Sequence, residues 1–259
     1  MELAQVIAGF AVGAIVGVTG VGGGSLMTPL LVLLFGVAPA TAVGTDLLYA
    51  AITKSGGVLV HSRRSNVDWR VTALLAAGSL PAAVVTLLIV AHVAPGGLGG
   101  ASKVITMSLG IALFLTALAL VFRQRLQAWS KARLSDALPA RHRGLITVLT
   151  GATIGIMVSL SSVGAGAIGV TALFLLYPHI AAIRIVGSDL AHAVPLTLVA
   201  GIGHWWLGSV DWTLLFTLLA GSLPGIFVGS HLASRIPERV LRSTLASMLI
   251  LVAGKLIIA

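Results

Sequence analysis

A single lysine lies deep inside one of the long apolar stretches of the sequence. Lys54 falls within the apolar residues 40–60, eight residues after Asp46 and seven before His61. A lysine at the centre of a membrane helix costs roughly 2.5 to 3.5 kcal/mol on insertion scales, so it usually has a task. The task could be to neutralise a dehydrated anion. A structural pair with Asp46, or snorkelling toward the membrane edge, would also explain it.

Two runs of small residues have the composition of an anion site. They read GVTGVGGGS at residues 17–25 and SLSSVGAGA at residues 159–167. Glycine lets backbone amides approach a ligand closely, and free amides with nearby hydroxyls can replace part of an oxyanion's hydration shell. The candidate binding residues, besides Lys54, are Thr19, Gly22, Gly23, Gly24, Ser25, Ser161, Ser162, Gly164 and Gly166. The alternative is that small residues only permit tight helix packing.

Two aspartates follow small residues at corresponding places in the chain. Asp46 comes after Gly44-Thr45, and Asp189 comes after Gly187-Ser188. The carboxylates could cap helices that start inside the membrane, or they could carry a coupling proton. His192 lies one turn after Asp189, which would suit a proton relay, although a satisfied polar residue in a packed interface fits its position too.

The composition places these residues in a membrane protein. Of 259 residues, 58% are hydrophobic and 9% are charged, a balance that excludes an ordinary soluble domain. At about 20 residues per span, the chain has room for roughly eight to ten transmembrane segments. The apolar segments run over residues 3–18, 25–36, 40–60, 71–92, 103–122, 144–160, 166–177, 181–205, 212–230 and 240–258.

An internal repeat divides the chain into two halves. Several short motifs recur at one offset of 143 residues, which drops to 142 for the two glycine runs. The recurring pairs are Asp68-Trp69 with Asp211-Trp212, Gly78-Ser79-Leu80-Pro81 with Gly221-Ser222-Leu223-Pro224, Val43-Gly44-Thr45-Asp46 with Val186-Gly187-Ser188-Asp189, and His61 with His204. We expect one membrane domain, 1–259, made of repeat 1 (1–122), a cytoplasmic linker (123–143) and repeat 2 (144–259).

The charges predict that the halves are inverted. The loop after the third segment carries Arg63, Arg64 and Arg70, whereas its mate, HWWLGSVDWT, carries no Lys or Arg. Five segments per half, an odd number, place the second half upside down. By the positive-inside rule, both termini then lie outside the bacterial inner membrane.

The first two segments of each half are short and separated by a small-residue run. We therefore expect broken or re-entrant helices, because irregular backbone at membrane depth is tolerated only where it lines a cavity or is buried in protein. His61, His204 and the tryptophans at 69, 205, 206 and 212 lie at helix edges, where we expect an interfacial belt.

Other function classes fit less well. The net charge of +9 sits mostly in short interhelical stretches, which is a topology signal rather than a nucleic-acid footprint. The chain has no cysteine, so it offers neither a disulfide nor a thiolate metal site, and we expect no cofactor. An intramembrane enzyme would need Ser161 and His192 as nucleophile and base. The sequence around Ser161 lacks the Gly-x-Ser-x-Gly turn that usually presents such a serine. The sequence does not exclude a passive anion channel. It is also compatible with a homodimer.

The combined motifs resemble a known family. The glycine run at 17–24, Val43 to Asp46, Asp68-Trp69-Arg70 and Gly78 to Pro81 are similar to the TauE/SafE sulfite exporter family, over essentially the whole chain. The second run, Ser161 to Gly166, departs from the usual family form. The resemblance implies a membrane transporter for sulfite, sulfoacetate or a related sulfur-containing anion. With the inverted halves, it predicts a secondary transporter working by alternating access and not an enzyme.

Overall fold

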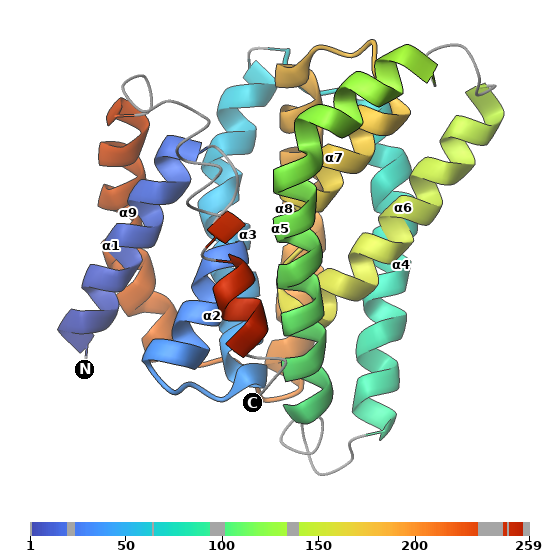
Figure 1. Ribbon diagram of the computed structural model, residues 1–259. Helices are drawn as coiled ribbons and strands as arrows, with labels where there is room; N and C mark the ends of the chain where they lie inside the picture. Colours follow the sequence, from blue (N-terminus) through green and yellow to red (C-terminus); the bar gives the residue numbers. More distant parts are fainter. Residues whose placement is uncertain are drawn as a thin grey trace.

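The computed structural model describes the chain except for residues 1, 20–23, 64, 94–101, 134–139, 233–245, 248 and 256–259. The described residues form α-helices with short connections and contain no β-strand (Figure 1). The helices are α1 (Glu2–Thr19), α2 (Gly24–Leu34), α3 (Pro39–Arg63), α4 (Trp69–Val93), α5 (Ser102–Arg133), α6 (Ala140–Ser161), α7 (Ala167–Leu176), α8 (Ala182–Trp206) and α9 (Trp212–Leu232). Residues 246–247 and 249–255 are also helical.

Several helices have the length and composition of membrane spans. Five stretches in the described chain are long and apolar enough to cross a bilayer: Trp69–His92, Ile105–Phe122, His142–Ser161, Ala182–Trp206 and Trp212–Gly229. α3 also has 25 residues, but it carries Asp46 and Lys54 in its interior. The protein is therefore an all-helical polytopic membrane protein, as its composition predicts.

Two helices are too short to cross the membrane alone. α2 has 11 residues and α7 has 10, so each rises by about 15 Å, half the hydrocarbon thickness of a bilayer. Both lie where the sequence predicts short segments. Each leaves a helix end within the bundle, and such ends need polar partners.

The predicted linker, residues 123–143, is mostly helical. α5 continues to Arg133 and α6 begins at Ala140, so most of residues 123–143 is helical. Apolar periodicity ends near Phe122, but the helix does not, because long polar side chains such as those of residues 123–133 favour helix as strongly as apolar ones do.

The outer helices pack across the two halves of the chain. α1 lies along α9, and α4 lies along α6 (Figure 1). Glycines make both contacts close: Gly13 lies against the backbone of Ser222, and Gly155 lies against the backbone of Ser79. Small residues at such crossings let two backbones approach where lipid provides no hydrophobic drive. In each pair, a helix from one half of the chain packs against a helix from the other half. The contacting residues of the two pairs are about 143 positions apart in the sequence.

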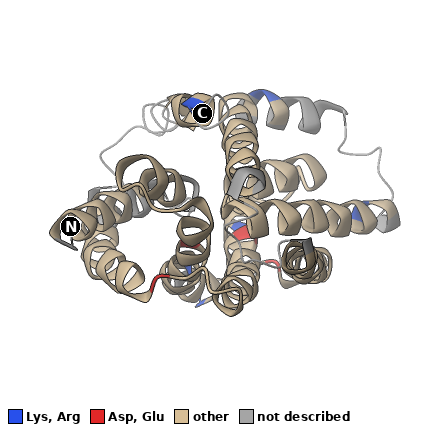
Figure 2. Ribbon diagram, turned by 90° about the horizontal axis from the view of Figure 1, so that it is seen from below, with Lys and Arg blue, Asp and Glu red and all other residues tan. Residues whose placement is uncertain are grey.

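The centre of the bundle is the crossing of α3 and α8. Leu48 lies against Gly201, and Gly57 lies against Leu190, so the two helices run antiparallel. In the view along the bundle, few charged residues lie among the packed helices, and a basic and an acidic residue lie together near the middle (Figure 2). α1 and α6 also run in opposite vertical directions in Figure 1.

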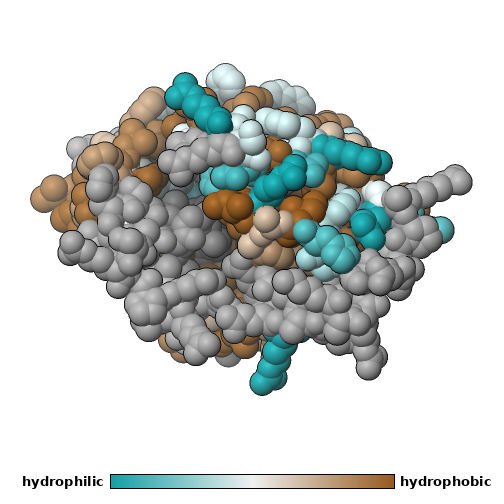
Figure 3. Space-filling model, turned by 90° about the horizontal axis from the view of Figure 1, so that it is seen from above, coloured by the Kyte–Doolittle hydropathy of each residue, from teal (hydrophilic) through white to brown (hydrophobic). Residues whose placement is uncertain are grey.

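One end of the bundle is basic. Arg70, Arg143 and Arg184 lie there, around the α3–α4 and α7–α8 connections. Seen from this end, hydrophilic side chains gather near the middle of the described surface (Figure 3). The connections at the opposite end, residues 35–38 and 207–211, carry no Lys or Arg.

The predicted interfacial residues divide into two groups. The four tryptophans are exposed, and Trp205 and Trp212 pack edge to face with ring centroids 5.7 Å apart, which suits a belt. His204 lies in the last turn of α8, as expected, but it is only 1% exposed, so it faces the protein interior and is not part of a lipid-facing belt. Its ring contacts Ser209 Oγ at 2.9 Å and the Ser159 carbonyl at 2.8 Å, and these two partners satisfy both nitrogens inside the protein.

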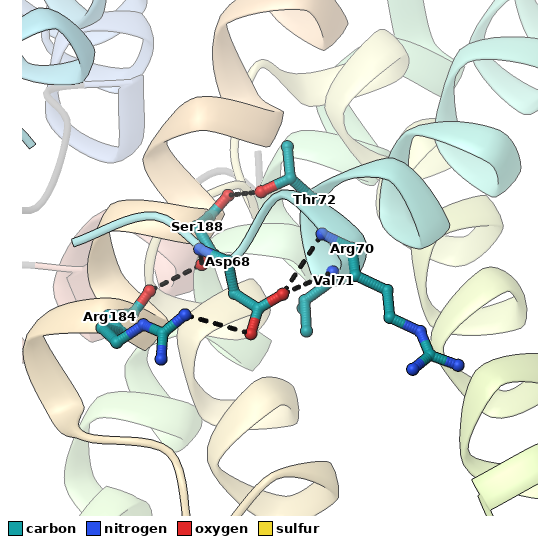
Figure 4. A network of polar contacts seen from close by, with 6 residues as sticks. All are labelled: Asp68, Arg70, Val71, Thr72, Arg184 and Ser188. Atoms are coloured by element: carbon teal, nitrogen blue, oxygen red, sulfur yellow. Dashed lines mark hydrogen bonds and ion pairs between the residues drawn. The ribbon is translucent and has the colours of Figure 1, made fainter. Parts of the chain in front are cut away.

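The Asp-Trp repeats are helix caps that tie the halves together. Asp68 precedes α4, and its Oδ1 accepts the amides of Arg70 and Val71 at 3.2 Å (Figure 4). The Asp68 amide donates to Ser188 Oγ of α8 at 2.7 Å. In the other half, the Asp211 amide donates to Thr45 Oγ1 at 3.1 Å, and Asp211 Oδ1 accepts the Leu214 amide at 2.9 Å. Motifs that mark the repeat are therefore contacts between the repeats.

The close α4–α6 crossing gives a testable consequence. Gly155→Ala should lower the unfolding temperature in detergent, because the new Cβ would meet the Ser79 backbone and overpacking typically costs about 1–3 kcal/mol. Gly56→Ala is the matched control, since nothing lies within 4 Å of its Cβ position on α3. A Gly155→Ala protein that melts with the control would contradict the packing described here.

Candidate functional site

The break between α6 and α7 places irregular backbone inside the protein. α6 ends at Ser161 and α7 starts at Ala167, so the interruption expected in the second half is present. Gly164 and Gly166 have φ angles of 124° and 129°, which side-chain-bearing residues rarely adopt. Ser162 has φ 58° and turns the chain out of α6.

The two serines at this break have different environments. The Ser161 hydroxyl donates to the Met157 carbonyl at 2.6 Å and also contacts the backbone of Val163. Ser162 is 4% exposed, and its buried hydroxyl has no hydrogen-bond partner among the described residues. Such a group is costly unless a ligand or water completes it. Ser162, unlike Ser161, is therefore not held by the α6 backbone.

The first glycine run lies mostly beyond what can be described. Gly22 and Gly23 are outside the described residues. Thr19 ends α1, and Gly24 and Ser25 begin α2, so α1 and α2 are separate helices with the run between them. The side chains of Thr19 and Ser25 are not among those described.

Asp46 is fully enclosed by α2, α3 and the α6–α7 break. It is 0% exposed. The Thr28 hydroxyl of α2 donates to its Oδ2, and Ser162 lies beside the carboxylate. Oδ1 has no partner in the described part of the protein. α3 begins seven residues earlier, at Pro39, so Asp46 does not cap α3. It lies instead against Thr28, near the start of α2.

Asp189 occupies the corresponding place on α8. It is 3% exposed, and its Oδ1 also lacks a hydrogen-bond partner among the described residues. Gly169 of α7 lies directly against this oxygen, where any side chain would collide with it. α8 begins at Ala182, so Asp189 does not cap α8; it lies against the first turn of α7, at Gly169. The apolar segments located the starts of both helices to within one residue, so the small residues before each aspartate were the misleading signal.

Lys54 lies between the two aspartates. Its side chain is 4% exposed, so it does not snorkel to the protein surface. It interacts electrostatically with both buried carboxylates, more strongly with Asp189 than with Asp46. The expected structural pair with Asp46 alone is therefore incomplete. One lysine serves two acids, and neither carboxylate is solvated.

His192 and Tyr49 face the same region. His192 Nε2 is 2.7 Å from Ser79 Oγ, and its Nδ1 has no described partner. Tyr49, which lies 143 residues before His192, is fully buried next to Ser222, the repeat mate of Ser79. His192 is thus paired with Ser79 and not with Ser161, which leaves the imagined nucleophile and base unformed.

Sequence reasoning missed Tyr49, Ser79 and Thr28 as neighbours of the site. The 143-residue offset could have found Tyr49 from His192, because it already aligned Ser79 with Ser222. Thr28 carries no such signal, since its contact with Asp46 depends on how α2 packs on α3.

The cluster is sealed, while a cavity opens at the basic end. Asp46, Lys54, Asp189 and His192 are each at most 4% exposed. A cavity of about 210 Å³ lies at the starts of α4 and α6 and is lined in part by Arg70, Arg143 and Tyr177. Among the described residues, no group of His, Asp or Glu could hold a metal ion.

Comparison with known proteins identifies the family of this chain. The family model described as "Sulfite exporter TauE/SafE" matches residues 5–256. A "Probable membrane transporter protein YjnA" of Bacillus subtilis (strain 168) is 38% identical over 99% of this chain and 100% of its own. YdhB of the same organism, also named a probable membrane transporter, is 27% identical over 91% and 92%. No solved structure matches the chain significantly. The chain therefore belongs to the TauE/SafE sulfite exporter family of membrane transporters.

Proposed function

We propose that this protein is a secondary transporter that moves a small anion, sulfite or a related sulfur-containing anion such as an organosulfonate, across the bacterial inner membrane. The description of the matching family names sulfite, and the similar Bacillus proteins are named as transporters. That membership and the buried cation at the centre of the bundle support this substrate class.

One observation carries the proposal. A buried lysine and an unpartnered buried hydroxyl, Lys54 and Ser162, both lie around Asp46 where a helix is interrupted. A cation and a free donor in a water-poor site are the groups that hold a dehydrated oxyanion. Ser162, the α7 amides after Gly166 and Lys54 are the residues that we assign to the anion. The residues of the first run, Thr19 and Gly22 to Ser25, stay candidates for the same role.

Alternating access between inverted repeats is the proposed mechanism. Its support is the exchange of helix partners, α1 with α9 and α4 with α6, and the matching caps at Asp68 and Asp211. The sealed cluster lies at the α3–α8 crossing, where rocking of one half against the other would open it to either side in turn.

The basic end faces the cytoplasm in this proposal. Arg70, Arg143 and Arg184 mark it, and the connections at the opposite end lack Lys and Arg. The start of α1 and the end of helical residues 249–255 both lie toward that opposite end (Figure 1), which supports the proposal that both termini lie outside.

Uptake into proteoliposomes tests the function. Sulfite, sulfate, thiosulfate and sulfoacetate are offered separately, and at least one of the four should enter protein-containing vesicles faster than empty ones. Accumulation above the outside concentration under an imposed gradient would distinguish a transporter from a passive channel. Failure of all four anions to enter would refute the proposal.

The serine assignment is tested with two adjacent substitutions. Ser162→Ala should raise the half-saturation concentration for the transported anion by about tenfold, because a hydrogen bond to a charged group contributes about 1.5–3 kcal/mol. Ser161→Ala should act on thermal stability instead, since that hydroxyl is held by the α6 backbone. Equal losses of affinity in both variants would remove the distinction.

Cysteine labelling tests the orientation. The chain has no native cysteine, so single cysteines give a clean signal. Ala38→Cys, in the connection between α2 and α3, should react with an impermeant thiol reagent in intact cells. Ser65→Cys, between α3 and α4, should react only after permeabilisation. The reverse order would overturn the proposed orientation.

A further inference from the structure

Charge balance at the centre of the bundle sets a condition on anion binding. Lys54 is the only Lys or Arg in the interior of the described helices α2, α3, α7 and α8, whereas the same region holds two aspartates. An anion entering this site replaces a carboxylate as the partner of the lysine. The displaced carboxylate is then left buried without a counter-charge, which costs several kcal/mol in a water-poor interior unless it becomes neutral.

The two aspartates lie on opposite sides of the lysine along α3. Lys54 lies between the contacts of Leu48 with Gly201 and of Gly57 with Leu190. Asp46 is eight residues before it, about 12 Å of helix rise. Asp189 precedes Leu190, which meets Gly57, and so lies beyond Lys54 on the side facing the basic end.

The carboxylates differ in what stabilises their charge. Asp46 accepts the Thr28 hydroxyl, and this donor depends on neither the lysine nor the anion. Asp189 has Lys54 as the group that stabilises its charge, and its Oδ1 is without a described partner against Gly169. The other titratable groups facing the cluster are His192, held by Ser79, and Tyr49, beside Ser222.

We propose that each anion is moved together with a proton, and that Asp189 carries this proton. When the anion takes Lys54, Asp189 loses its counter-charge and an O–H bond forms at Oδ1 with a proton from the side on which the anion entered. When the anion leaves, Lys54 returns to Asp189 and the proton is released to the side of exit. Asp46 keeps the Thr28 hydroxyl, which is not among the groups assigned to the anion, so its protonation does not change. This inference rests on the proposed anion transport.

The test measures protons and anions in the same vesicles. Full-length protein is reconstituted with an internal pH dye, and uptake of each of radiolabelled sulfite, sulfate, thiosulfate and sulfoacetate is followed with the internal pH. We expect about one proton per anion for the transported anion, and a tenfold proton gradient, acid outside, should support up to about tenfold accumulation of a monovalent anion.

Three substitutions of carboxylate by amide identify the carrier. Asp189→Asn should bring the proton-to-anion ratio close to zero in whatever flux remains. Asp46→Asn should keep the ratio. Asp211→Asn is the matched control: it removes a carboxylate at the membrane edge, and asparagine caps the α9 start as well as aspartate does. Sulfite itself takes up protons near neutral pH, but that proton would persist in every variant.

Each outcome has a distinct meaning. Wild-type flux without proton movement would overturn the coupling and leave the transporter function intact. A ratio that falls in Asp46→Asn and not in Asp189→Asn would overturn the assignment of the carrier. If Asp189→Asn does not fold, the wild-type ratio alone decides the coupling. If no anion is taken up at all, the proposed function fails, and this inference fails with it.

Discussion

The structure depends on burying one lysine between two aspartates where α3 crosses α8. No single helix could hold these groups in lipid, because an unsolvated charge is stable only with a partner and a closed surrounding. The short α2 supplies the Thr28 hydroxyl to Asp46, and the short α7 supplies the bare backbone of Gly169 next to Asp189. Broken segments that would be poor membrane spans are thus the elements that enclose the charges.

The outer helices make this enclosure stable. α1 with α9 and α4 with α6 meet backbone to backbone at glycines such as Gly13 and Gly155, which provides van der Waals packing where lipid gives no hydrophobic drive. The capping aspartates, Asp68 and Asp211, each hydrogen-bond to the central helix of the other half. The contacts that orient α3 and α8 therefore come from both halves of the chain.

The sequence predicts the segments and the important polar residues better than it predicts their contacts. Apolar length located the helices, and a fixed offset located the caps, because both signals are local or repeated. The apolar segments begin at residues 40 and 181, within one residue of the helix starts at Pro39 and Ala182. Asp46 and Asp189 were nevertheless expected at caps, because each follows small residues. Of the two acidic neighbours of Lys54, the sequence predicted Asp46 but not Asp189. Asp189 and Thr28 reach the site by packing of distant segments, and a single sequence does not encode that packing in a readable pattern.

The halves are alike in backbone contacts but not in charge. Lys54 corresponds to Thr197, and Arg184 corresponds to Thr41. At the basic end, Arg184 Nη2 is 3.5 Å from Asp68 Oδ2, while the repeat-related position opposite Asp211 offers only a hydroxyl. With the side chains 47% and 24% exposed, this pair contributes about 0–1 kcal/mol. Two arrangements related by a symmetric scaffold would have equal free energies. In the proposed cycle, an ion pair of this size would shift the equilibrium at most a few-fold toward closure at the basic end, so asymmetric charges on similar halves would bias which side the empty site favours.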